Sequence, residues 1–118
     1  AKDAFEAAYA GVSADGSPTF IFAPQAYDAV MLMAISAAAN GVTGPEIASG
    51  LVAASSGGEK CIGVACIALA ADGVDVDYVG ASGEIELNEA GDPTAATYDI
   101  WTTEGDVNPV LKSVDFGS

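Results

Sequence analysis

The chain has 118 residues, which is enough for one domain and too few for two sizeable ones. Apolar residues make up 51% of the sequence, so we expect a folded core rather than a disordered chain. The formal net charge is −14, from 17 acidic and 3 basic residues, and because nucleic acids and anionic membranes are bound through cations, we expect neither as a partner.

The first predicted element is a helix over residues 3–11, which Asp3 can cap. Its apolar residues recur at the spacing of one helical stripe, formed by Phe5, Ala8, Tyr9 and Val12. Residues 13–18 have the composition of a turn, and residues 19–22 form a short β-prone run whose secondary structure periodicity alone does not assign.

The clearest predicted helix covers residues 24–40. Pro24 suits the first helical position, where its missing N–H is not needed, and Gly41 is expected to stop the helix. The main apolar stripe consists of Tyr27, Val30, Met31, Ile35 and Ala38. Apolar residues also occupy most of the other faces, so we expect neighbouring elements to cover this helix on several sides.

Two further helices are predicted before the pattern changes. Thr43 and Glu46 have the spacing of a capping box, which starts a helix that ends near residue 55. A fourth, short helix is expected over residues 61–71, with one face formed by Ile62, Ala65, Cys66 and Leu69.

The second part of the chain alternates with period two, as strands do. Val74, Val76 and Tyr78 alternate with aspartates, a glycine-containing turn follows at residues 80–83, and another strand is expected over residues 97–103. Residues 88–93 form a loop that favours a plain turn over a calcium site, because it is shorter than an EF-hand loop and lacks its ligand spacing. Residues 108–111 are predicted as a short turn.

Helices followed by a small sheet indicate an α/β or α+β class with no internal repeat. The sequence contains no His, which removes an imidazole base, a Ser-His-Asp triad and a His-bound metal, and its three basic residues are all lysines. We therefore expect no enzyme activity, no cofactor and no metal site.

Three segments in order resemble one family. They are Phe5 and Tyr9 followed by Ala26-Tyr27-Asp28-Ala29-Val30, then residues 75–83 followed by residues 84–93, and finally Ala96-Thr97-Tyr98-Asp99-Ile100-Trp101. Together they are similar to the closing part of type I periplasmic solute-binding proteins, and the similarity covers roughly residues 3–105. The chain departs from the family pattern at Leu87, where the family has Phe, and at Asn88, where it has Asp.

The resemblance implies an α/β fold of the periplasmic-binding-protein-like type I class, of which residues 1–118 form a single partial domain. Family members are much longer and have two lobes, so we expect this chain to be a C-terminal fragment, with a strand and hinge or tail region over roughly residues 94–118. The implied function is that of a periplasmic substrate-binding component of an ABC transporter for branched-chain amino acids or related solutes. Its partners are then a small solute and the transporter permease.

The same resemblance points to candidate sites. Phe22, Gln25 and Tyr27 precede or begin the long helix, a stretch that borders the cleft between lobes in the family, and core packing is the competing interpretation for the aromatics. Export to an oxidising compartment favours a disulfide between Cys61 and Cys66, and two buried free thiols are the alternative.

A second function remains open, namely a structural or interaction domain that binds no solute. Left uncovered, Met31, Leu32, Met33 and Ile35 would expose an apolar patch that monomers rarely tolerate. The sequence therefore predicts a homo-oligomer, or association with the missing part of a parent chain.

Overall fold

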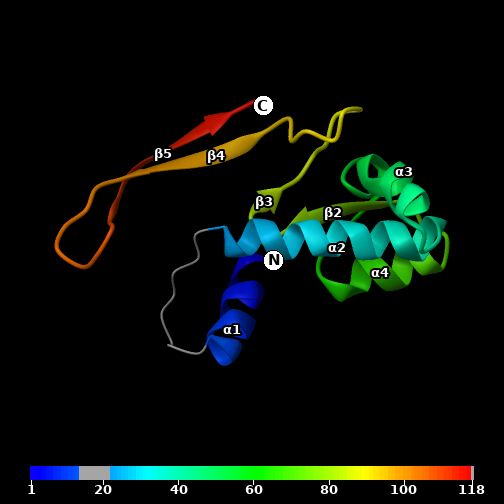
Figure 1. The fold of residues 1–118 in the computed structure, drawn as a ribbon, viewed down its shortest axis with the longest axis horizontal. Helices are drawn as coiled ribbons and strands as arrows, with labels where there is room; N and C mark the ends of the chain where they lie inside the picture. The colour runs from blue at the N-terminus through cyan, green and yellow to red at the C-terminus, as the bar shows by residue number, and fades with distance from the viewer. Residues whose placement is uncertain (14–21, 118) are drawn as a thin grey trace.

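A computed structural model describes residues 1–13 and 22–117 (Figure 1). The helices are α1 (Lys2–Val12), α2 (Ala23–Asn40), α3 (Gly44–Ala54) and α4 (Val64–Ala71). The strands are β1 (Glu59–Cys61), β2 (Val76–Gly80), β3 (Gly83–Glu84), β4 (Ala96–Trp101) and β5 (Val110–Phe116). The β-prone run expected over residues 19–22 lies, except for Phe22, outside the described residues, as does most of the turn expected over residues 13–18.

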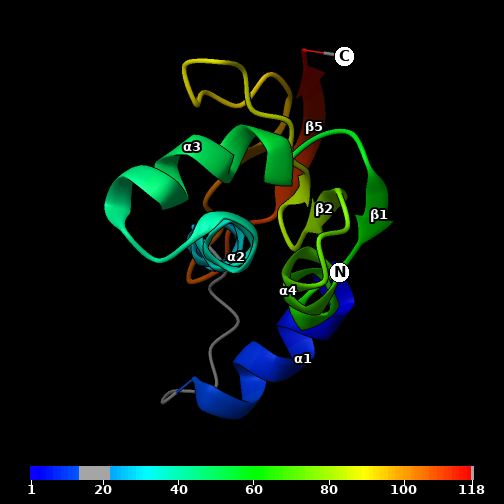
Figure 2. The same cartoon turned by 90° about the vertical axis from the view of Figure 1, so that its right-hand side faces the viewer.

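The long helix α2 lies at the centre of the core. Figure 2, which looks along its axis, shows α3 on one side of it and α4 and β2 on another. Met31, Leu32 and Ile35 are all buried, and they pack with Cys66, Ala70, Val76 and Tyr78 from the surrounding elements. The expectation of cover on several sides is therefore confirmed, whereas the reason given for self-association is wrong, because most of the expected patch on α2 is covered from within the chain.

The helix ends follow the expected chemistry with small shifts. Gly41 ends α2 with a φ of 119°, and a Cβ built there would lie 2.6 Å from the Glu46 carboxylate, so only glycine fits. The Glu46 carboxylate accepts hydrogen bonds from the Thr43 N–H at 2.9 Å and the Thr43 hydroxyl at 2.7 Å, which lower the pKa of Glu46. The prediction that Asp3 caps the first helix is wrong, because α1 begins at Lys2 with Ala1 in the N-cap position, and Asp3 lies in its first turn.

One element was missed between α3 and α4. The segment predicted as a helix over residues 61–71 contains the end of β1, and α4 begins only at Val64. β1 pairs in parallel with β2, with Cys61 opposite Tyr78, and α4 is the connection between the two strands (Figure 2). A three-residue strand with a single buried position has no detectable period, so only its pairing with β2 reveals it. The resulting strand–helix–strand unit confirms the α/β class.

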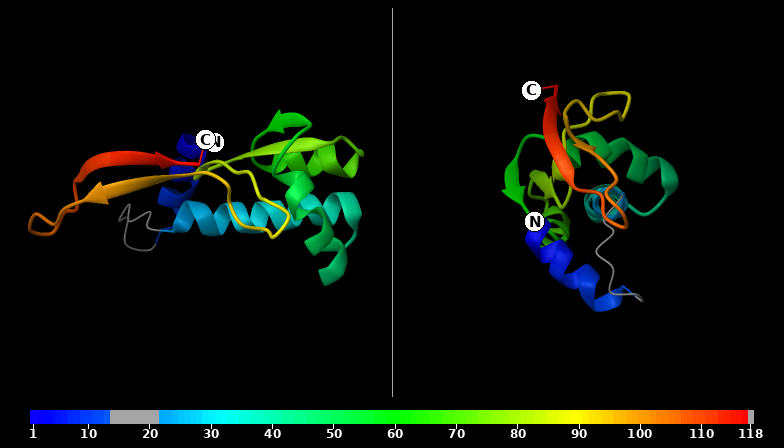
Figure 3. Two further views of the ribbon diagram at one scale, coloured as in Figure 1. Left: turned by 90° about the horizontal axis from the view of Figure 1, so that it is seen from above. Right: turned by 90° about the vertical axis from the view of Figure 1, so that its left-hand side faces the viewer.

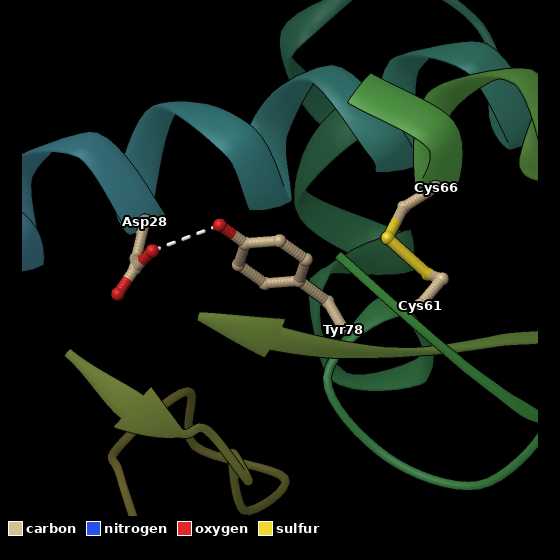
Figure 4. The surroundings of a disulfide bond; sticks show 4 residues. All are labelled: Asp28, Cys61, Cys66 and Tyr78. Carbon is tan, nitrogen blue, oxygen red and sulfur yellow. Dashed lines mark hydrogen bonds between the residues drawn. A yellow bond between two sulfur atoms is a disulfide. The ribbon is translucent and has the colours of Figure 1, made fainter. Parts of the chain in front are cut away.

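The disulfide between Cys61 and Cys66 is present (Figure 4). It joins the end of β1 to the first turns of α4 across five residues, with the two Cα atoms 5.4 Å apart. Both cysteines belong to the buried core, since their exposed fractions are 8% and 0%. The bond therefore fixes the connection between the parallel strands at the point where it enters the core.

Alkylation without reductant is expected to leave both cysteines unmodified, and alkylation after reduction in denaturant to add two groups. On the chain-entropy model a loop this short contributes about 2 kcal/mol to stability, so reduction should lower the free energy of unfolding by that amount. Intact mass spectrometry and urea unfolding with and without reductant measure the two effects. Two thiols that alkylate freely in protein from an oxidising compartment would contradict the assignment.

The loop over residues 88–93 is a plain turn, as expected. The Asn88 side-chain oxygen accepts hydrogen bonds from the N–H groups of Ala90 and Asp92, and Gly91 has a φ of 84°. Two backbone hydrogen bonds, from the Asn88 N–H to the Asp92 carbonyl and from the Gly91 N–H to the Asn88 carbonyl, close the same turn. Within residues 1–13 and 22–117, no group of three or more His, Cys, Asp or Glu side chains is placed to hold a metal ion.

The last two strands form a hairpin that extends away from the helices (Figures 1 and 3). β4 and β5 pair only with each other, in antiparallel register with an irregularity at Ile100 and Trp101. β4 lies within the predicted segment 97–103 apart from its first residue. The short turn predicted at residues 108–111 is wrong in its second half, because β5 begins at Val110. Every residue of both strands is exposed.

Candidate ligand-binding groove

The Asp28 carboxylate joins α2 to the turn between β2 and β3. It is only 2% exposed, and four groups donate hydrogen bonds to it. One oxygen accepts from the Tyr78 hydroxyl at 2.8 Å and the Ala81 N–H at 2.7 Å, and the other accepts from the Ser82 N–H at 2.8 Å and the Ser82 hydroxyl at 2.6 Å. Figure 4 shows the Tyr78 side chain pointing along β2 toward Asp28. These bonds offset the cost of burying a charge.

The hydrogen bonds to Asp28 require the end of β2 to lie close to α2. A Cβ built on Gly80 would lie 2.5 Å from a carboxylate oxygen of Asp28 and 2.7 Å from the Ile85 side chain. Glycine at this position therefore lets the β2–β3 turn reach the carboxylate. The pKa of the Tyr78 hydroxyl lies well above its usual value. The larger cause is burial, which disfavours the charged phenolate, and the second is the hydrogen bond that the neutral hydroxyl donates to Asp28.

The structure directs Asp28 to the turn at residues 80–83, which lies within the second stretch that carries the family resemblance. Tyr27-Asp28-Ala29 and Gly80-Ala81-Ser82-Gly83 thus meet in space through one carboxylate. Their separation by about fifty residues hid this contact, and no local pattern in the sequence could have revealed it.

A groove of about 610 Å³ runs beside this carboxylate, between α2, the β3 strand with its following loop, and the near end of the β4–β5 hairpin. Its walls are mainly apolar, and they include Leu32, Met33, Ile85, Leu87 and Phe116. Its polar lining residues are Gln25, Asp28, Ser82, Glu84, Thr97 and Asp115. The size and the few polar groups fit a small-molecule site.

The charges of the groove all have the same sign. Among the described residues that line it, Asp28, Glu84 and Asp115 are acidic and none is basic. Glu84 is paired with Lys60 at the surface, which lowers the pKa of Glu84 and raises that of Lys60. The groove therefore favours an ammonium over a carboxylate wherever a ligand meets these side chains.

The three candidate ligand residues do not lie together. Gln25 lines the groove, whereas Tyr27 packs against Phe5 of α1 with ring centroids 5.2 Å apart. Phe22 precedes α2 with a φ of 62° and is 76% exposed, an uncommon conformation for a bulky residue. A role for these residues in binding therefore stays a prediction, with Gln25 the one that borders a cavity.

A strand–helix–strand unit covered by helices and bordered by an apolar groove defines an α/β ligand-binding domain. A family model described as the receptor family ligand binding region matches residues 3–106, and the chain belongs to this family, the ligand-binding region of type I periplasmic-binding-like proteins. Family members bind small molecules, are not enzymes, and are typically extracellular or periplasmic.

Neither the curated proteins nor the solved structures compared with the chain include a significant match. Within the described part of the chain, no helix has the length and apolar character needed to cross a membrane.

Proposed function

We propose that this chain is part of an exported solute-binding protein that supplies an ABC transporter permease with branched-chain amino acids or related small solutes. The family match over residues 3–106 carries the proposal, because it assigns a ligand-binding role to nearly the whole chain. The apolar groove supports an apolar solute, and the disulfide supports an oxidising compartment.

The solute contacts are proposed to involve Phe22, Gln25 and Tyr27. All three residues lie at the N-terminus of α2, and a helix N-terminus favours an anionic group such as a solute carboxylate. The acidic lining of the groove favours the ammonium of the same solute, and Gln25 lies between the two features as both a helix N-terminal residue and a lining residue. This arrangement suits a zwitterionic amino acid with an apolar side chain.

The binding surface in this chain is one-sided, since the groove is open to solvent over part of its length. The second lobe that a type I protein contributes is proposed to come from the rest of a parent chain. Without its contacts we expect leucine or valine to bind no tighter than about millimolar, because few pre-organised contacts offset the entropy of immobilising the solute.

A titration of the isotopically labelled chain with leucine, followed by NMR, tests this proposal. Leucine at concentrations on the order of 10 mM is expected to shift the amide signals of Gln25 and its groove neighbours. Gln25→Ala should weaken these shifts, and Asn108→Ala, in the distant β4–β5 connection, should leave them unchanged. Glycine serves as the control solute without an apolar side chain.

Absence of any shift, or equal shifts with glycine and leucine, would contradict solute binding at this groove. A micromolar dissociation constant would instead contradict the view that the site is incomplete, because it would mean that this chain alone supplies the contacts that a second lobe is proposed to add.

A further inference from the structure

The end of α2 carries the one Asn-Gly pair of the sequence. Asn40 is the last residue of the helix and Gly41 is its C-cap, whereas the other two asparagines precede Glu89 and Pro109. Glycine has no side chain to shield its backbone nitrogen, so this nitrogen can readily approach the side chain of the residue before it. Asparagine is one of the thermolabile residues of proteins, and a following glycine is its most reactive context. The end of α2 therefore has an intrinsic chemical reactivity.

The reaction of such a pair is intramolecular and consumes only water. The Gly41 backbone nitrogen loses its proton and attacks Cγ of Asn40; a C–N bond forms, the bond between Cγ and Nδ2 breaks, and the side-chain nitrogen takes up a proton and leaves as ammonia. The product is a cyclic succinimide, to which water then adds. Opening of the ring at Cγ gives aspartate. Opening at the backbone carbonyl carbon gives isoaspartate, in which the chain runs through the side-chain carbon.

Three hydrogen bonds hold the pair in an unreactive arrangement. The Gly41 N–H donates to the Ala37 carbonyl at 3.1 Å, so the nitrogen keeps its proton within the helical ladder. The Asn40 side-chain amide donates to the Ser36 carbonyl at 3.1 Å and to the Ser36 hydroxyl oxygen at 3.4 Å. These two bonds direct the side chain back along α2, away from Gly41. Attack on Cγ therefore requires the last turn of the helix to open.

The helix α3 packs against this turn (Figure 1). A Cβ built on Gly50 of α3 would overlap the Asn40 amide nitrogen and the Ser36 hydroxyl oxygen, so glycine lets the two helices approach here. The Ser36 hydroxyl is buried and donates to the Ile47 carbonyl of α3 at 2.7 Å. Opening of the end of α2 therefore also loosens α3, and the two events form one step of local unfolding.

We propose that Asn40 is a site of spontaneous modification, which the folded chain protects and which opening of the contact between α2 and α3 exposes to conversion into aspartate or isoaspartate. Conversion is irreversible, so the modified fraction records the time that the contact has spent open. The reaction needs neither a partner nor a cofactor, and the inference does not depend on solute binding at the groove.

The products do not fit the environment of the amide. A carboxylate at residue 40 meets the Ser36 carbonyl, which only accepts, and a hydroxyl whose proton is already donated to Ile47. The carboxylate gains a donor only if Ser36 gives up its bond to α3. A negative charge is also disfavoured at the C-terminal end of a helix, and the chain already has a net charge of −14. Isoaspartate lengthens the backbone just before Gly41. Both products therefore weaken the contact that protected the amide.

Asn88 provides the opposite case. Its side-chain oxygen accepts hydrogen bonds from the N–H groups of Ala90 and Asp92, and a carboxylate oxygen accepts such bonds equally well. The same change from amide to carboxylate removes a needed donor at Asn40 and keeps the needed acceptor at Asn88. The two asparagines therefore form a matched pair for an experiment.

Peptide mapping by mass spectrometry, after incubation of the 118-residue chain at mildly alkaline pH, follows the modification. We expect Asn40 to be converted in chain unfolded by guanidinium chloride, and at least about 10-fold more slowly in the folded chain, because its hydrogen bonds must open first. Asn108 is the internal control, since Pro109 has no backbone N–H and the ring cannot form there in either sample.

Ser36→Ala tests the protection directly. It removes the hydroxyl that joins Asn40 to α3, and should speed conversion of Asn40 at least about 3-fold in the folded chain while leaving the rate in guanidinium chloride unchanged. Circular dichroism verifies that this variant is folded under the conditions of incubation.

Asn40→Asp tests the consequence of the modification and does not require the reaction to occur. Hydrogen exchange of the α3 amides should be at least about 10-fold faster than in the parent, because local opening becomes more frequent. Asn88→Asp adds the same charge in the loop after β3 and should change these exchange rates by no more than about 2-fold.

Equal rates of conversion at Asn40 in the folded and unfolded chains would overturn the proposal, as would a folded-chain rate that Ser36→Ala leaves unchanged. Absence of conversion in guanidinium chloride would show that residue 40 is not a modification site. If Asn40→Asp is as mild as Asn88→Asp, modification does not loosen α3 and that part of the inference is wrong.

Discussion

Replacement of Asp28 by alanine is expected to lower the free energy of unfolding by about 3–5 kcal/mol. The change removes the acceptor for the Tyr78 hydroxyl, for the N–H groups of Ala81 and Ser82, and for the Ser82 hydroxyl. Buried donors then lose their partners in a site where Tyr78 is 1% exposed, and each unsatisfied group costs its full desolvation. Because small domains are stable by only about 5–15 kcal/mol, this loss is a large fraction of the total stability.

Urea unfolding followed by circular dichroism measures this loss. Glu89→Ala, an acid-to-alanine change in the exposed loop after Asn88, should shift the free energy of unfolding by no more than about 0.5 kcal/mol. Asp28→Asn keeps one carbonyl oxygen and should be intermediate. If Asp28→Ala is as mild as Glu89→Ala, the carboxylate does not hold the β2–β3 turn against α2.

Alkaline pH is expected to destabilise the protein through Tyr78. Its pKa in the folded chain lies well above the value of about 10 that it has when unfolded, because burial and the hydrogen bond to Asp28 both oppose ionisation. Above pH 10 the unfolded chain releases this proton while the folded chain keeps it. The stability that Tyr78 contributes is therefore complete below pH 10, and between that pH and the folded pKa it falls by about 1.4 kcal/mol per pH unit.

Tyr78→Phe isolates this contribution. At pH 8 the variant should be less stable than the parent by about 1.5–3 kcal/mol, because it loses a hydrogen bond to a charged group. At pH 11 the difference should shrink by about 1.4 kcal/mol, since phenylalanine has no proton to release. Lys60, whose pKa is raised by Glu84, is present in both proteins and cancels in the comparison. A difference that is the same at pH 8 and pH 11 would show that Tyr78 titrates alike in both states.

The elements with a clear period were predicted well. The apolar residues of α2, the capping box of α3 and the alternation of β2 each appear within one short window of sequence, and the structure has all three. Of the two strands that were missed, β1 is three residues long and has no detectable period, so its pairing with β2 defines it. Polar and apolar residues do alternate over residues 113–116 of β5, and this short signal at the end of the chain was overlooked.

The candidate site was predicted only in part. Gln25 borders the groove because it lies one turn before Asp28 on the same helix, which a helical period can indicate. The opposite wall is formed by residues of β3, of the following loop and of the hairpin, which lie far along the chain. Tyr27, predicted beside Gln25 as a ligand residue, packs against Phe5 because the course of α1 relative to α2 decides which side of the helix is free.

Composition and local pattern by themselves determined the acidic charge, the helical first half with its central buried helix, and a resemblance that the family match confirmed. These properties depend on residue types and on short-range spacing, which a single sequence contains in full. Only the tertiary structure decided what Asp28 binds, that α2 is covered from within the chain, and that the exposed apolar surface lies on the β4–β5 hairpin instead. Each of these depends on contacts between segments many residues apart, and the free energy of such contacts is set by packing in space and not by local propensity.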